Sequence, residues 1–189
     1  MSVVKLQQSY ADQVLSMIEQ IDRHAIIAGG APRDWYLGEE ATDLDVYFHP
    51  DPSWDTITTY HALQDFGFTF DGYRDFGEAG ISYGKTEQIK AIFEPTNTPM
   101  KVQLMMMSES VQSCVLQSFA LDLSLVSYKY GSIVTTTEFV NAVVTKTISR
   151  INPDYSDYDP YIVKILGKFP DYKYTYTSKP SIEVVEIPF

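Results

Sequence analysis

Apolar residues recur along this chain with two different periods, which together predict an ordered series of helices and strands. Between Val4 and Ile21 they recur at the spacing of an amphipathic helix. From Asp43 to Phe48 the chain is rich in β-branched and aromatic residues, as expected of a strand. The pattern predicts further helices over 31–37, 51–66, 109–118, 138–148 and 161–166, and further strands over 24–28, 88–93, 101–107, 119–129 and 132–136.

The order of these elements predicts an α+β fold, with a mixed β-sheet flanked by helices. Helices and strands alternate at first, and mostly strands follow. A length of 189 residues is enough for one sizeable core. We expect residues 1–150 to form one domain and residues 151–189 to form a short helical and extended C-terminal region packed on it.

Charge and composition narrow the classes of partner. The net charge is −11, and no cluster of Lys and Arg is visible. Proteins that bind nucleic acids usually carry a basic face, because neutralising phosphates supplies most of their affinity. The sequence predicts no clear face of this kind. An acidic chain suits a small substrate complexed with a metal ion. No apolar run is long enough to span a membrane and no signal peptide is visible, so we expect no membrane partner and a cytoplasmic location.

Two carboxylates stand at the start of the strand expected over 43–48. Asp43 and Asp45 are two positions apart, so their side chains leave the same face of the strand. Val46 and Phe48 follow and are apolar, which places the pair beside a core. Two buried carboxylates are costly unless a cation neutralises them, and Mg²⁺ prefers carboxylate and phosphate oxygens. An Asp-x-Asp pair taken alone is more often a surface turn.

A second cluster of candidate residues precedes this pair. Gly29 and Gly30 lie at a strand-to-helix junction, where glycine permits close approach of the backbone and free N–H groups face a phosphate. Arg33 follows in the first turn and carries a forked guanidinium. Taken singly, Gly-Gly is a common turn and Arg33-Asp34 is a surface ion pair worth little. The combination with Asp43 and Asp45 is far more specific.

The segment Gly29–Asp45 resembles the signature of the DNA polymerase β-like nucleotidyltransferase superfamily, in the form found in class II CCA-adding enzymes and bacterial poly(A) polymerases. That signature runs Gly-Gly, Arg-Asp, a short helix ending in Leu-Gly, and Asp-x-Asp. The matching positions are Gly29, Gly30, Arg33, Asp34, Leu37, Gly38, Asp43 and Asp45.

The resemblance implies a nucleotidyltransferase fold and an enzyme that uses Mg²⁺ or Mn²⁺ with a nucleoside triphosphate (NTP) as substrate. It implies that Asp43 and Asp45 bind the metal ions and take part in catalysis. It also implies that Gly29 and Gly30 contact the triphosphate, while Arg33 and Asp34 organise the site.

Enzymes of this kind generally use a third carboxylate on a neighbouring strand, as base and metal ligand. Asp122 is the first choice, because it lies in the otherwise apolar stretch FALDLSLV. The alternative is that Asp122 faces solvent on a half-exposed strand. Gln103 is the second position considered, and a neutral amide there could not act as a base.

The remainder of the chain departs from the CCA-adding pattern and leaves two functions open. No basic tRNA-binding region follows, and Ala120 stands where an Asp is often found. The stretch after Lys101 is more similar to small stand-alone nucleotidyltransferase-like proteins of bacteriophages, which would act in the host cytoplasm. The first hypothesis is an enzyme that transfers a nucleoside monophosphate to a hydroxyl acceptor, namely an RNA 3′ end, a protein or a small molecule. The second is a catalytically degenerate binding, phage structural or host-interaction protein.

Overall fold

The computed structural model describes residues 2–76, 81–82, 87–110, 115–116, 118–151 and 160–175. Cys114, half of the helix expected over 109–118 and the tail beyond Thr175 lie outside the described residues. The helices are α1 (Val3–Ile18), α2 (Gly30–Tyr36), α3 (Thr56–Asp65), the 3₁₀ helix η1 (Asp122–Ser124), α5 (Thr137–Thr145) and α6 (Pro160–Lys168). The strands are β1 (Ile26–Ala28), β2 (Asp43–Phe48), β3 (Tyr73–Asp75), β4 (Ile81–Ser82), β5 (Glu87–Phe93), β6 (Lys101–Met107), β7 (Val126–Lys129), β8 (Ser132–Thr135), β9 (Thr147–Ser149) and β10 (Lys173–Thr175).

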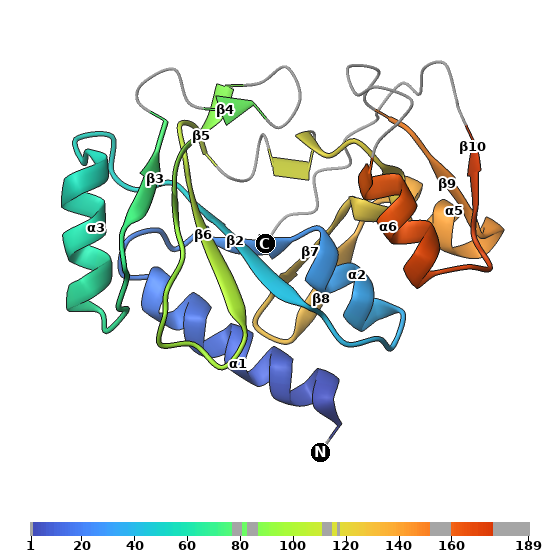
Figure 1. The fold of residues 1–189 in the computed structure, drawn as a ribbon, viewed down its shortest axis with the longest axis horizontal. Coiled ribbons are helices and arrows are strands. Elements are labelled where there is room, and N and C mark those ends of the chain that lie inside the picture. Colours follow the sequence, from blue (N-terminus) through green and yellow to red (C-terminus); the bar gives the residue numbers. More distant parts are fainter. Residues whose placement is uncertain are drawn as a thin grey trace.

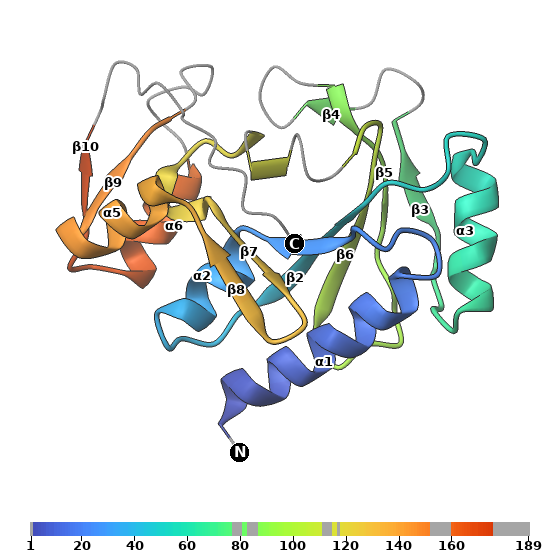
Figure 2. The same cartoon turned by 180° about the vertical axis from the view of Figure 1, so that it is seen from behind.

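A mixed sheet forms the centre of the molecule, which confirms the expected α+β architecture. Its strand order is β3-β5-β6-β2-β1-β7-β8, with β4 paired to β5. The pair β2 and β6 is parallel, and the other pairs of this sheet are antiparallel. Figures 1 and 2 show α3 beside β3 at one end of the molecule and the C-terminal elements at the other.

Helix α1 covers one face of the sheet and encloses the larger core. It begins where the Ser2 side chain accepts a hydrogen bond from the Lys5 backbone N–H, as an N-cap does. Its buried stripe comprises Ala11, Val14, Leu15 and Ile18. This stripe packs in one cluster with alternate residues of β2 and β6, namely Leu44, Val46, Phe48, Val102, Leu104 and Met106. The remaining residues of β2, which include Asp43 and Asp45, therefore leave the opposite face of the sheet.

A second apolar cluster joins η1, α5 and β9 to the C-terminal elements. It includes residues on both sides of position 150, for example Leu123, Phe139 and Ile148 before it and Ile165 and Phe169 after it. Strand β10 pairs in parallel with β9 to form a separate small sheet. Helix α6 is thereby held beside α5 and β9 (Figure 1).

Three predicted elements differ from the structure. The helix expected over 51–66 begins only at Thr56, where the Asp55 side chain caps it. The strand expected over 119–129 is divided, because Asp122 starts a 3₁₀ turn and the strand begins only at Val126. The Asp122 carboxylate accepts a hydrogen bond from the Leu123 backbone N–H, and such local bonds compete with strand pairing. The helix expected over 138–148 ends at Thr145, because Lys146 adopts a left-handed conformation with φ of 54°. No helix in the described ranges is long and apolar enough to cross a membrane.

Candidate functional site

The side chains of Asp43 and Asp45 stand together on one face of β2, both half-buried. Asp43 Oδ1 accepts a hydrogen bond of 3.0 Å from the Thr42 hydroxyl. Asp45 Oδ1 is buried and has no hydrogen-bond partner among the described residues. A buried oxygen of this kind is costly to leave unpaired. The position is therefore suited to a cation that the protein itself does not supply.

The electrostatics of Asp45 support the same conclusion. Burial first, and the neighbouring Asp43 charge second, raise the pKa of the Asp45 carboxyl to about 7. The positive charges of Lys101 and Lys164 act in the opposite direction and lower this pKa. Additional positive charge at this position would favour the ionised form of the Asp45 carboxyl.

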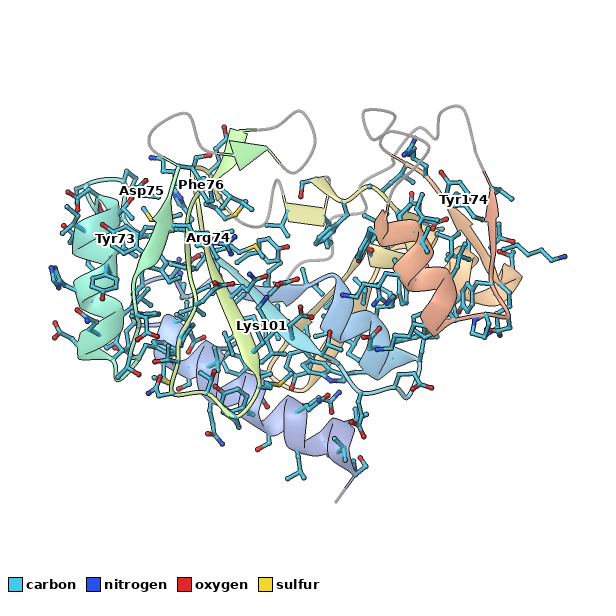
Figure 3. All side chains as sticks on the ribbon, in the orientation of Figure 1. Tyr73, Arg74, Asp75, Phe76, Lys101 and Tyr174 are labelled. Atoms are coloured by element: carbon cyan, nitrogen blue, oxygen red, sulfur yellow. The ribbon has the colours of Figure 1, made fainter. Side chains whose placement is uncertain are left out.

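The strand next to β2 places an amide, not an acid, beside Asp45. In the parallel pairing of β2 with β6, Asp43 lies opposite Lys101 and Asp45 lies opposite Gln103. Gln103 Nε2 donates a hydrogen bond of 2.6 Å to Glu94 Oε1. The same oxygen lies 3.1 Å from Arg74 Nη2 and 3.8 Å from Lys101 Nζ. Figure 3 labels Arg74 and Lys101 on this sheet.

The turn before α2 needs glycine at its first position. Gly29 has φ of +84° and ψ of −116°, a conformation that L side chains rarely adopt. A Cβ atom there would also lie 3.2 Å from the Phe119 ring. The Gly29 N–H donates to the Val126 carbonyl at 3.0 Å, which ties the turn to β7. The start of α2 is therefore fixed against the sheet, close to the end of β1.

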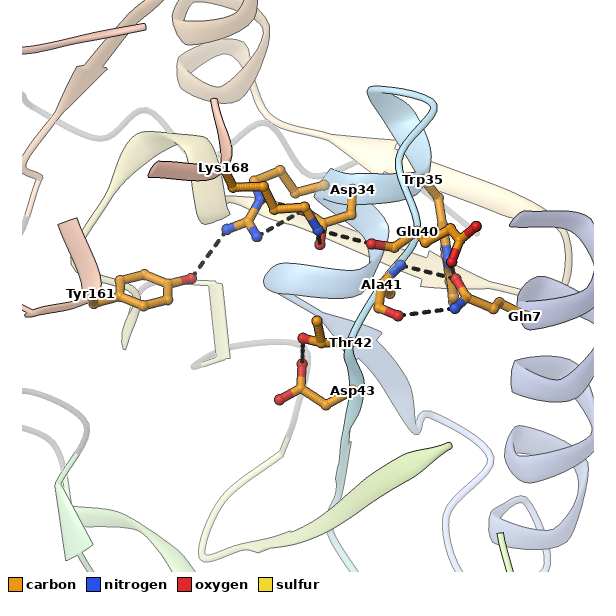
Figure 4. Close-up of polar contacts among 10 residues, drawn as sticks. Gln7, Asp34, Trp35, Glu40, Ala41, Thr42, Asp43, Tyr161 and Lys168 are labelled. Carbon is orange, nitrogen blue, oxygen red and sulfur yellow. Dashed lines mark hydrogen bonds and ion pairs between the residues drawn. The ribbon is translucent and has the colours of Figure 1, made fainter. Parts of the chain in front are cut away.

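Arg33 and Asp34 form a buried network and not the surface ion pair considered as an alternative. Arg33 Nε donates to Asp34 Oδ1 at 2.8 Å, and both residues are buried. Lys168 Nζ lies 2.6 Å from Asp34 Oδ2. Arg33 Nη1 donates to the Tyr161 hydroxyl at 3.3 Å, and the guanidinium lies 5.5 Å from the centre of the Phe169 ring. Figure 4 shows these contacts between α2 and α6, with Asp43 nearby.

The Asp122 carboxylate is engaged by backbone N–H groups of η1 and β9. Its Oδ1 accepts hydrogen bonds from the backbone N–H of Leu123 at 2.7 Å and of Ser149 at 2.9 Å. Burial raises the pKa of the Asp122 carboxyl to about 6, although these hydrogen bonds lower it. Across the described ranges, no three His, Cys, Asp or Glu side chains come together as a metal site. Among the described residues no such group unites Asp122 with Asp43 and Asp45, and the Asp122 carboxylate instead connects η1 to β9.

Three charged residues near the pair were not singled out from the sequence. Lys101 is recognisable only once β6 is paired with β2, and Glu94 only through its contact with Gln103. Lys164 lies far along the chain, and its electrostatic effect on Asp45 depends on the packing of α6. The sequence carries no local signal for any of them.

Comparisons with known proteins bear on the fold. No protein-family model matches the sequence, and no curated protein matches it. A tRNA-processing enzyme in an apo form matches with a TM-score of 0.59 and 15% identity, over 93% of this chain and 45% of that chain. A CCA-adding enzyme in complex with CTP matches with a TM-score of 0.54 and 10% identity, over 87% of this chain and 39% of that chain.

A third match is a tRNA nucleotidyltransferase complexed with a primer tRNA and an incoming ATP analog. Its TM-score is 0.50 and its identity 17%, over 80% of this chain and 43% of that chain. The chain therefore spans less than half of the length of each of these enzymes. These matches show that the chain has the fold that these tRNA nucleotidyltransferases and CCA-adding enzymes share over the matched part.

Proposed function

We propose that the chain is a Mg²⁺-dependent nucleotidyltransferase, for which Mn²⁺ can replace Mg²⁺. It moves a nucleoside monophosphate from an NTP to a hydroxyl acceptor, which is an RNA 3′ end, a protein or a small molecule. The observation that carries this proposal is the Asp43–Asp45 pair in this fold, with Asp45 Oδ1 buried and without a partner among the described residues.

The two carboxylates fit the proposed metal ion. Mg²⁺ is a hard cation that is often held by one or two carboxylates, with water and substrate phosphates as its other ligands. Asp43 and Asp45 would hold it, and the unpartnered oxygen of Asp45 would gain a ligand. A bound ion would neutralise the charge of both carboxylates and would polarise a phosphoryl oxygen of the substrate.

The other site residues position the nucleotide in this proposal. Gly29 and Gly30 bring the backbone close to the triphosphate, and a side chain at Gly29 is already disfavoured by its positive φ. Arg33 and Asp34 hold α2 against α6. The acceptor hydroxyl oxygen forms a bond to the α-phosphorus, and the bond from that phosphorus to the oxygen bridging it to the β-phosphate breaks. Pyrophosphate leaves, and the hydroxyl proton passes to solvent water.

A second candidate function is nucleotide binding without transfer, in a phage structural or host-interaction protein. The observation that favours it is Gln103, which occupies the position opposite Asp45 on the neighbouring strand. A neutral amide cannot take the proton of an acceptor hydroxyl. No third carboxylate joins the pair in the part of the chain that the structure describes.

The ligands of the matched enzymes support candidate partners for this proposal. One matched enzyme was solved with CTP, and another with a primer tRNA and an ATP analog. We propose an NTP as the substrate of this chain and RNA as one of its candidate acceptors. The net charge of −11 disfavours acceptors that bind through many phosphates.

A transfer assay separates the two functions. The protein is incubated with each α-labelled NTP, Mg²⁺ or Mn²⁺, and RNA or cell lysate, and labelled acceptors are identified by mass spectrometry. The enzyme hypothesis expects label that disappears in the double variant Asp43→Ala, Asp45→Ala and persists in Asp71→Ala, an exposed control. Metal-dependent NTP binding without labelled product supports the binding protein instead.

A further inference from the structure

Helix α6 is attached to the candidate site at two points, one near each end of the helix. Near its start the Tyr161 hydroxyl accepts a hydrogen bond from Arg33. At its end Lys168 Nζ binds Asp34 Oδ2 at 2.6 Å and the Glu40 carbonyl at 2.8 Å. The side of α6 that carries Tyr161 and Lys168 therefore faces α2 and Glu40, which lies shortly before β2; Figure 4 shows the contacts at both ends.

Lys164 lies on this side of α6. Residues three or four positions apart share a helix face, so Lys164 lies on the same side as Tyr161 and Lys168. Its neighbour Ile165 is buried in the second apolar cluster, whereas Lys164 is exposed. Lys164 makes no hydrogen bond or ion pair with another described residue, yet its charge lowers the pKa of the Asp45 carboxyl. Its ammonium group therefore lies on the side of α6 that is attached to the site, acts electrostatically on Asp45, and is available to a ligand.

The charge of a bound nucleotide needs more cations than the metal ion alone. A triphosphate keeps net negative charge after it binds one divalent cation, and charged hydrogen bonds to phosphate are strong. Arg33 and Lys168 are already paired with the buried Asp34. Lys101 is exposed and contacts only the exposed Glu94, at 3.8 Å, among the described residues.

We propose that Lys164 of α6, assisted by Lys101 of β6, binds the triphosphate of the nucleotide opposite Asp43 and Asp45. This rests on the proposed function and extends it, because it makes α6 a nucleotide-binding element. Tyr161 and Lys168 position the helix, and Lys164 contacts the phosphates. The nucleotide then lies between the sheet and α6.

Calorimetry on the full chain tests the role of Lys164. The ligands are Mg²⁺ complexes of each NTP and of inorganic tripolyphosphate, together with the free nucleosides. We expect Lys164→Gln to raise the Kd for the NTP and for tripolyphosphate about tenfold or more, the effect of losing one charged hydrogen bond. Lys164→Arg retains the charge and should bind within a few-fold of wild type.

Two controls make the outcome decisive. Lys173→Gln removes an equally exposed Lys on β10 and should leave every Kd unchanged. Any nucleoside binding should be unaffected by Lys164→Gln, because a nucleoside lacks phosphates. Equal NTP affinity of wild type and Lys164→Gln overturns this inference alone, provided that Asp43→Ala with Asp45→Ala abolishes binding. Failure of the wild type to bind any NTP with Mg²⁺ or Mn²⁺ overturns the proposed function together with it.

Discussion

Asp45 carries a carboxyl group whose burial opposes its ionisation. Burial raises its pKa to about 7, so the folded chain holds a proton that an unfolded Asp has already released. Folded stability therefore falls as pH rises from about 4 to about 7, and this loss persists above that range. A bound cation reverses the effect, because it favours the ionised form.

Replacing Asp45 with Asn should remove this loss of stability. We expect Asp45→Asn to match wild type near pH 4 and to exceed its free energy of unfolding at pH 8 by on the order of 2 kcal/mol, since one pKa unit is worth about 1.4 kcal/mol. Solvent screens this half-buried group, so the expected difference in free energy of unfolding is smaller than the whole pKa shift would give. Urea unfolding without divalent cations, at several pH values, measures the difference. A parallel pH dependence of the two proteins would contradict the assignment, and Asp71→Asn is the exposed control.

Gln103 decides how many acids the metal site contains. Its place opposite Asp45 means that Gln103→Glu adds a carboxylate beside the pair. We expect this variant to bind Mn²⁺ several-fold more tightly, because carboxylate ligands set the affinity for hard cations. Without metal it should be less stable than wild type, since Glu94 adds a further negative charge.

Calorimetric titration with Mn²⁺, with and without NTP, measures this change in affinity. Gln103→Met is the matched control, because it changes the same position without adding charge. Unchanged Mn²⁺ affinity of Gln103→Glu would mean that position 103 does not face the ion.

Among the elements, the short turn η1 carries a structural acid. Asp122 accepts hydrogen bonds from Leu123 and Ser149, so its carboxylate connects η1 to β9. We expect Asp122→Ala to cost about 1–3 kcal/mol, the penalty of leaving buried N–H groups unpaired. Asp122→Asn keeps an acceptor and should cost less.

Transfer activity per folded molecule separates this role from catalysis. Both Asp122 variants should retain the wild-type rate at a temperature where they are fully folded. Loss of transfer in a folded Asp122→Asn protein that still binds the NTP would mean that Asp122 takes part in catalysis.

What the sequence could predict depends on how local each feature is. The segment Gly29–Asp45 is a continuous stretch whose turn, helix and strand arise from neighbouring residues, and it correctly indicated the fold. Asp122 resembled a strand residue, because its bond from Ser149 N–H spans 27 positions and leaves no signal in the neighbouring sequence. Lys164 reaches the site through the packing of α6, which depends on contacts with residues more than a hundred positions earlier.

At the scale of the whole molecule, two apolar clusters have different relations to the site. The larger cluster supports β2 from the side of α1, whereas the second cluster holds α6 and hence Lys164. Helix α2 lies between them and joins them through the Arg33 and Asp34 contacts. Packing defects in the two clusters should therefore affect nucleotide binding differently, even where they cost similar stability.

A matched pair of cavity variants tests this difference. Leu15→Ala and Ile165→Ala each truncate a buried aliphatic side chain and should each cost about 2–5 kcal/mol in urea unfolding. At low temperature, with both variants folded, we expect Ile165→Ala to raise the Kd for the NTP complex because α6 is less firmly held. Leu15→Ala should leave that Kd close to wild type. Equal changes in Kd would mean that α6 has no separate part in binding, and that the site senses only global stability.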